Sequence, residues 1–303
     1  MNTKAKKLYY LKKQFILSLL MFTSVVYSQG WQWQNPLPQG NALSSIQYLT
    51  NNIIFAGVLG GGSILKSTDG GNTWKTIVLP ERIYIEDIFF ISENKGWVCG
   101  EIETESDVFG IVMGTIDGGK TWETQLDISY QLTTIKFADE RNGWVSGTAA
   151  RVYHTTNGGQ NWEMQVNLPG DIHSFFVVDT LNVWAANTGN VGGALYYTND
   201  GGKNWLADST IDWSNDIQFV DSLNGWIAGR DKIARTMDGG KSWETQLETL
   251  SLELTDICMY DTINGWALTS FNTKIAITTN GGKNWQIRDN PADYDLNAIS
   301  FSD

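Results

Sequence analysis

Thr115-Ile-Asp-Gly-Gly-Lys-Thr-Trp122 is one of six versions of the same eight-residue motif in this chain of 303 residues. The other five are Ser67–Trp74, Thr155–Trp162, Thr198–Trp205, Thr236–Trp243 and Thr278–Trp285. The closing tryptophans follow one another at intervals of 48, 40, 43, 38 and 42 residues. A period of about 40–45 residues, with only strand-like segments between turns, is typical of four-stranded propeller blades.

We call this eight-residue motif the box. A second motif lies between successive boxes, as in Asn142-Gly-Trp144 and Asn224-Gly-Trp226. A short apolar strand precedes it each time, for example Ile135–Phe137. Asn-Gly and Asp-Gly supply the residues with positive φ that tight hairpins need. Each repeat is therefore predicted as four antiparallel strands, with the second and fourth starting at a tryptophan. No segment after residue 28 has convincing helical periodicity.

The two ends of the repeat region predict parts of one more blade. Trp33 precedes Trp74 by 41 residues, so Trp31–Asn35 is expected to be a fourth strand. Ala298–Phe301 resembles the first strands of the other repeats. We therefore predict an all-β, seven-bladed propeller over residues 29–303 whose seventh blade is incomplete because the chain stops early. A six-bladed ring with two loose ends is the alternative.

Residues 1–28 have the composition of a secretory signal peptide. Five lysines precede the apolar run Phe15–Val26, which is too short for a comfortable membrane span, and cleavage is expected after Ser28. Its removal changes the net charge from −12 to −17, since the segment contains five lysines and no acidic residue. A chain this acidic excludes nucleic acid as a partner. We expect a secreted protein, in the periplasm, on the cell surface or outside the cell, that is not embedded in the membrane.

The residues of the box can be explained by the turn that they form. The side chain at its third position accepts hydrogen bonds from nearby backbone N–H groups, the glycines take left-handed conformations, and the tryptophan packs between sheets. Asparagine replaces aspartate in two boxes, and a turn needs only the acceptor oxygen, whereas catalysis or calcium binding needs the charge. The predicted structural residues are Asp69, Asp117, Asn157, Asp200, Asp238 and Asn280 with Trp74, Trp122, Trp162, Trp205, Trp243 and Trp285.

These motifs resemble the Asp-box, or BNR, repeat of sialidases, xyloglucan hydrolases, sortilin-type receptors and the photosystem II assembly-factor family. The doubled glycine, the Asn-Gly-Trp motif and Trp31-Gln-Trp-Gln-Asn-Pro-Leu-Pro38 are most similar to the last of these. The resemblance covers nearly all of the chain after residue 28. It implies a seven-bladed propeller that serves as an assembly or docking module without enzymatic activity.

The loops on the side away from the boxes are longer, more varied and acidic. They carry 19 acidic residues, among them Glu86, Asp87, Glu253 and Asp256, against five basic ones. One interpretation is a solvated acidic rim that aids solubility; the other is a site for a basic or neutral protein or glycan partner, with aromatic side chains supplying contact area. The candidate binding residues are Tyr84, Tyr130, Asp212, Trp213, Asp216, Tyr294 and Asp295.

Enzymatic function has weaker support in the sequence. A sialidase needs clustered arginines, and only six follow residue 28. A hydrolase of neutral glycans needs two carboxylates about 5–10 Å apart, and the acidic loops offer many without a motif that selects a pair. This glycoside hydrolase is the alternative function. No catalytic residue, cofactor or metal site is predicted, because two histidines and two cysteines are too few for a histidine-rich site and lack ligand spacing.

Overall fold

The computed structural model describes residues 41–104, 107–187, 195–270, 274–290 and 296–301. All of them belong to the larger of two compact units, Pro36–Asp303. Strands dominate these residues, and the one helical element among them is the 3-10 turn Thr148–Ala150. No helix in the described part of the chain is long and apolar enough to cross a membrane.

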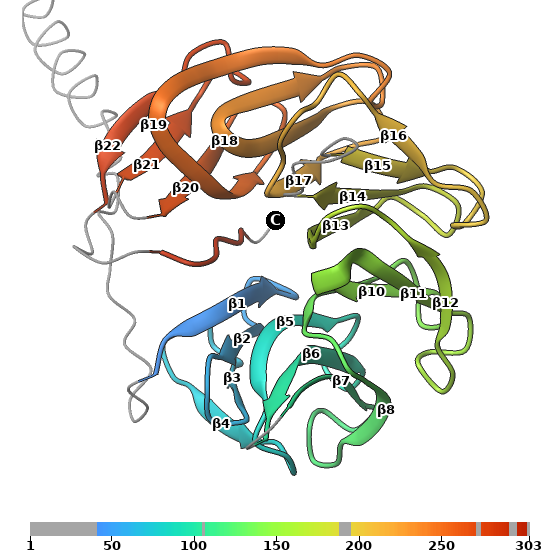
Figure 1. Cartoon of the computed structure of the whole chain (residues 1–303). Helices are drawn as coiled ribbons and strands as arrows, with labels where there is room; N and C mark the ends of the chain where they lie inside the picture. The colour runs from blue at the N-terminus through green and yellow to red at the C-terminus, as the bar shows by residue number, and fades with distance from the viewer. Residues whose placement is uncertain (1–40, 105–106, 188–194, 271–273, 291–295, 302–303) are drawn as a thin grey trace, which may run out of the picture. The chain divides into compact units, whose positions relative to one another are not determined.

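The strands form five antiparallel sheets, four of which have four strands in chain order (Figure 1). The first two sheets contain β1 (Leu43–Tyr48), β2 (Ile54–Val58), β3 (Ser63–Ser67) and β4 (Lys75–Val78), then β5 (Tyr84–Phe90), β6 (Gly96–Glu103), β7 (Val108–Thr115) and β8 (Glu123–Ile128). The next two contain β9 (Leu132–Phe137), β10 (Gly143–Gly147), β11 (Arg151–Thr155) and β12 (Glu163–Asn167), then β13 (Ile172–Val177), β14 (Val183–Asn187), β15 (Leu195–Thr198) and β16 (Leu206–Asp208).

The fifth sheet combines the fifth and sixth sequence repeats. It contains β17 (Asp216–Phe219), β18 (Gly225–Thr236), β19 (Glu244–Met259), β20 (Gly265–Ser270), β21 (Lys274–Thr278) and β22 (Gln286–Asp289). The long strand β18 forms the second and third strands of the fifth repeat. The long strand β19 forms the fourth strand of the fifth repeat and the first strand of the sixth. The first part of β19 pairs with β18, and its second part, Glu253–Met259, pairs with β20. The predicted four strands per repeat are thus present, with two blades joined at their boundary.

The first strands of successive repeats lie next to one another. β1 contacts β5, β5 contacts β9, β9 contacts β13, β13 contacts β17, and β17 contacts β19. We call β1, β5, β9, β13, β17 and the Glu253–Met259 part of β19 the inner strands. The apolar core lies between the sheets, and one cluster joins Phe55 of the first sheet with Phe90 and Met113 of the second.

The count of seven blades stays a prediction. Trp31–Asn35 lies outside the described residues, and Ala298–Phe301 has no strand assignment, unlike the predicted first strand. The segment nevertheless contacts inner strands on two sides: the Tyr48 N–H donates to Ser300 Oγ (3.3 Å), and the Ile299 N–H donates to Asp256 Oδ2 (2.7 Å). These contacts run through side chains, which is why they do not make a regular strand ladder.

Candidate functional site: the central cavity

A cavity of about 850 Å³ lies among the inner strands, and residues 297–300 close one part of its wall. Every inner strand contributes to the lining. The side that an inner strand turns to this cavity carries backbone N–H groups with no neighbouring strand, and such groups need other partners. Polar side chains of adjacent repeats satisfy several of them.

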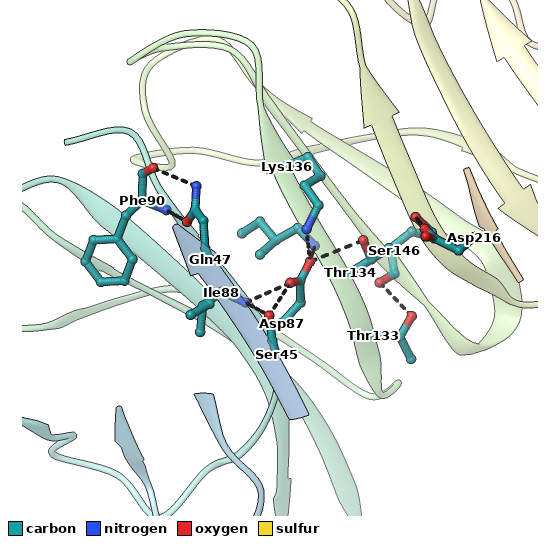
Figure 2. A network of polar contacts seen from close by, with 12 residues as sticks. Ser45, Gln47, Asp87, Ile88, Phe90, Thr133, Thr134, Lys136, Ser146 and Asp216 are labelled. Carbon is teal, nitrogen blue, oxygen red and sulfur yellow. Dashed lines mark hydrogen bonds and ion pairs between the residues drawn. The ribbon is translucent and has the colours of Figure 1, made fainter. Parts of the chain in front are cut away.

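Asp87 on β5 forms the densest of these contacts (Figure 2). Its Oδ1 accepts hydrogen bonds from Ser45 Oγ on β1 and from the Ile88 N–H, both at 2.9 Å. Its Oδ2 accepts from the Ile135 N–H (3.0 Å) and from Lys136 Nζ on β9 (2.6 Å). Asp87 is buried, so one carboxylate ties together the inner strands of three repeats.

Asp216 and Asp256 occupy the same position in the fifth and sixth repeats. Asp216 accepts from Ser174 Oγ (2.5 Å) and from the Ile257 N–H (2.9 Å). Asp256 in turn accepts from the Ile299 N–H. Burial and the charge of Asp216 raise the pKa of Asp256 well above its ordinary value. The contact between the two aspartates therefore favours a proton on Asp256.

Two glutamines provide the same kind of contact one pleat further along the strands. The Gln47 side chain accepts from the Phe90 N–H and donates to the Phe90 carbonyl oxygen (2.7 and 3.0 Å). Gln218 makes the matching pair of hydrogen bonds with the backbone of Met259. Each glutamine amide thus satisfies one backbone donor and one acceptor on the next inner strand.

The cavity has an excess of negative charge. Its acidic lining residues are Glu86, Asp87, Asp216, Glu253 and Asp256. Lys136 is the basic counterpart among the lining residues, and its ion pair with Asp87 already uses it. Burial, followed by the charge of the neighbouring Glu101, raises the pKa of Glu86 to about 7. A cation at this place would relieve that repulsion, whereas an anion would increase it.

We expect Glu86→Gln to stabilise the protein above pH 7 and to change little at pH 4.5. Because the pKa of Glu86 is higher in the folded state, folding is favoured while the group stays protonated, and that contribution is lost as the pH rises from about 4.5 to about 7. Solvent screening of this partly exposed group leaves a gain of about 1–2 kcal/mol at pH 8. Urea unfolding at both pH values measures it; equal gains at both would contradict the titration of Glu86.

The structure separates the residues predicted for the binding face. Trp213 and Asp216 line the cavity, and Asp216 begins β17 instead of belonging to a loop. Tyr130 is covered by the Arg151 guanidinium, whose carbon lies 4.1 Å from the ring centre, and exposed Asp212 lies 4.0 Å from Lys232. Tyr84 lies on β5 outside the cavity lining. Tyr294 and Asp295 lie outside the described residues.

The sequence interpretation missed Lys136, Ser45 and Gln47. Alignment of the inner strands would have indicated Ser45, since Ser45, Asp87, Thr134, Ser174, Asp216 and Asp256 each directly precede the Ile or Phe that opens the apolar part of the strand. Polar residues at one position of every repeat indicate a shared environment. The partners of each, however, are decided by packing between repeats.

The boxes all have one geometry. In the second repeat, the Thr115 hydroxyl accepts from the Gly119 N–H (2.9 Å) and donates to Asp117 (3.0 Å), which also accepts from the Thr121 N–H (2.9 Å). Gly118 and Gly119 have φ of 76° and 86°. Asn157 and Asn280 accept the same backbone hydrogen bond, from Asn161 and Asn284. The box carboxylates are therefore engaged in their own turns.

Three of the box tryptophans lie edge-on against aromatic core residues. The Trp122 ring meets Phe90 at 87°, and the Trp162 ring meets Phe137 at 81°. Trp243 contacts both Trp184 of the preceding repeat and Phe219 of its own. No cluster of three or more His, Cys, Asp or Glu suited to a metal ion occurs among the residues that the structure describes.

Comparison with known proteins supports the resemblance seen in the motifs. Residues 72–211 match the family model described as photosynthesis system II assembly factor YCF48. The photosystem II assembly lipoprotein Ycf48 of Synechococcus sp. (strain CC9902) is 29% identical over 232 residues, which are 74% of this chain and 67% of that relative. The resemblance to this family is therefore confirmed for the repeat region.

Solved structures agree on the fold. YCF48 from Cyanidioschyzon merolae has a TM-score of 0.64 at 20% identity, covering 84% of this chain and 87% of its own. The GH74 xyloglucanase from Xanthomonas campestris has a TM-score of 0.67 at 11% identity, covering 82% of this chain and 45% of its own. The described part of the chain is a β-propeller, the fold that solved propeller domains share with it.

Proposed function

We propose that this chain, which carries the repeats of the photosystem II assembly-factor family over residues 72–211, is an exported, non-catalytic scaffold for protein assembly. We further propose that its acidic cavity and the acidic loops beside it bind a basic or neutral segment of a partner protein. The name of the Synechococcus relative, an assembly lipoprotein, supports both assembly and export. Cleavage after Ser28 remains a prediction.

The observation that carries the binding site is the uncompensated charge of the cavity. Five carboxyl groups line it; Asp87 is paired with Lys136 and Asp256 favours its protonated form, which leaves Glu86, Asp216 and Glu253 without a basic partner among the lining residues. Next to it, burial and the charge of Glu103 raise the pKa of Glu101. Because these carboxylates repel one another in the unbound protein, a cationic side chain of a partner that enters the cavity would reduce the repulsion and bind favourably.

Neutralising these acids should weaken binding of a basic peptide in a salt-dependent way. We expect Glu86→Gln, Glu101→Gln and Glu253→Gln together to reduce the affinity for hexalysine by about 10-fold at 50 mM NaCl, and the difference to shrink at 0.5 M because salt screens exposed charges. Isothermal titration calorimetry measures both. These residues are preferable to Asp216, whose side chain also holds the Ile257 N–H.

The matched control neutralises three exposed acids, Glu123, Glu163 and Glu244, each of which begins the fourth strand of its repeat. At pH 8, where Glu86 is mostly ionised, it changes the net charge by nearly the same amount at another place on the molecule. Equal losses of affinity in both triple variants would mean that hexalysine senses only the overall charge, and would overturn the site.

The geometry does not favour the glycoside hydrolase. Retaining glycosidases keep their two carboxyl groups about 5–5.5 Å apart, and inverting ones further. The carboxylate of Asp216 instead accepts the Ile257 N–H of the next inner strand, and that of Asp256 accepts the Ile299 N–H of the segment that follows β22, so both are engaged with the backbone. Turnover of soluble glucans that disappears in Asp216→Asn would restore the enzyme; the scaffold predicts none.

A further inference from the structure

The turn between the first and second strands of each repeat lies against the box of the same repeat. The first box glycine donates its N–H to a carbonyl oxygen of this turn in every repeat, at 2.7–3.0 Å. The six acceptors are Asn52, Asn94, Arg141, Leu181, Leu223 and Ile263. This position is polar in the first three repeats and apolar in the last three. The change occurs at a structurally equivalent place, so the fold does not require it.

The three apolar residues are exposed in spite of their size. Leu181, Leu223 and Ile263 are 54%, 53% and 52% exposed, and Met237 in the box of the fifth repeat is 60% exposed. Large apolar side chains gathered on one surface of a soluble protein indicate an interaction site. Since none of the four contributes to the core, stability of the propeller does not explain them.

Successive boxes are linked, so these side chains share one face. Arg235 of the fifth repeat donates to the Gly281 carbonyl oxygen in the next box (2.7 Å). A Cβ atom added to Gly240 would lie 2.3 Å from a ring carbon of Trp184 in the fourth repeat. The box of the fifth repeat therefore packs directly against the fourth repeat. We call the surface made by Leu181, Leu223, Ile263 and Met237 the box-side patch.

Charges recur beside each apolar residue. The acidic residues Asp179, Asp221 and Asp261 precede the three apolar residues by two positions. Hydrogen bonds from the backbone of the same turn contribute to lowering the pKa of each, so they are charged at neutral pH. The exposed lysines Lys203, Lys241 and Lys283 follow the second glycine of the same three boxes, and the ion pairs found in the described residues include none of them.

The combination of aspartate, apolar residue and lysine occurs only in the last three repeats. The corresponding residues are Thr50, Asn52 and Asn72 in the first repeat, Ser92, Asn94 and Lys120 in the second, and Asp139, Arg141 and Gln160 in the third. The turn aspartates and the lysines are three of each sign; the same boxes add the carboxylates of Asp200 and Asp238, and Arg235 lies beside the box of the sixth repeat. A surface that carries separate groups of both signs can pair with itself under two-fold symmetry when the axis places unlike groups opposite each other.

We propose that the box-side patch binds the same patch of a second copy of this chain, forming a two-fold dimer. With the axis at the fifth repeat, Leu223 meets Leu223 of the second copy, and the fourth repeat faces the sixth. Each row of lysines then lies opposite a row of aspartates. The acidic cavities of both copies are left to other partners, so the dimer is independent of the function proposed above.

Sedimentation equilibrium of the purified protein tests this interface. We expect a dimer at micromolar concentration in 0.15 M NaCl, and a dissociation constant raised about 10-fold or more by Leu223→Asp, which places two charges at the two-fold axis. Lys241→Glu should weaken the dimer less, and most at low salt. A protein that is monomeric at all concentrations up to about 100 μM, well above micromolar affinities, would overturn the proposal.

Ile116→Asp is the matched control. Ile116 is 78% exposed and occupies the same box position as Met237, but in the second repeat, outside the patch. It should leave the dimer unchanged, and both variants should keep the wild-type circular dichroism spectrum and Tm. Dissociation caused by Ile116→Asp as strongly as by Leu223→Asp would also overturn the proposal. Hexalysine binding should be the same in Leu223→Asp and wild type, which separates this interface from the cavity.

Discussion

Asp87→Ala is expected to lower the free energy of unfolding by about 3 kcal/mol, because it leaves a largely buried ammonium group without its partner. Lys136 Nζ lies 2.6 Å from Asp87 Oδ2, and the lysine side chain is 29% exposed. The truncation also removes the acceptor of Ser45 Oγ and of the Ile135 N–H. Inner strands of three repeats lose a contact at once. Guanidinium unfolding at pH 7 measures the change.

The double variant Asp87→Ala with Lys136→Met separates the charge from the rest of the network. If the unpaired lysine causes most of the loss, removing it as well should recover part of the stability. Losses that simply add would mean that the two side chains act independently, contrary to the observed ion pair. Gln47→Ala is a useful comparison, since it breaks inter-repeat hydrogen bonds with Phe90 without leaving a charge.

The local structure could be predicted from the sequence because each repeat carries its own turn chemistry. Gly-Gly in the boxes adopts positive φ in all six repeats, and the strands fall where the motif spacing places them. Three of the tryptophans near the start of the second strands, Trp97, Trp144 and Trp226, are among the largest fully buried side chains. These features depend on residues within a few positions of one another.

The polar network of the cavity depends on residues far apart in the chain. Asp87 and Lys136 are 49 positions apart, and Ile299 and Asp256 are 43 apart. Their contact follows from how closely neighbouring blades approach, which no local pattern reveals. The same reason explains Asp216. It follows a loop in the sequence and looks like a surface acid, but the first hydrogen bonds of β17 turn it toward Ser174 and Ile257.

Trp97→Ala should cause a loss of similar or larger size, about 3–5 kcal/mol, because it empties the space between two blades. Trp97 is 1% exposed, and its ring stacks on Phe137 of the next repeat, with 3.5 Å between ring centres. Its indole N–H also donates to the Gly158 carbonyl oxygen in that repeat's box (3.2 Å). Trp97→Phe keeps much of the packing and should lose less, chiefly the hydrogen bond.

Trp266 is the matched control for this contact, since it is the second residue of the second strand in the sixth repeat, as Trp97 is in the second repeat. It is half-buried, and the ring it contacts on the following segment is Phe301, 4.5 Å away. Trp266→Ala should therefore destabilise the protein clearly less than Trp97→Ala in the same unfolding experiment. Equal losses would mean that Trp266 is as enclosed in solution as Trp97, contrary to its partial exposure.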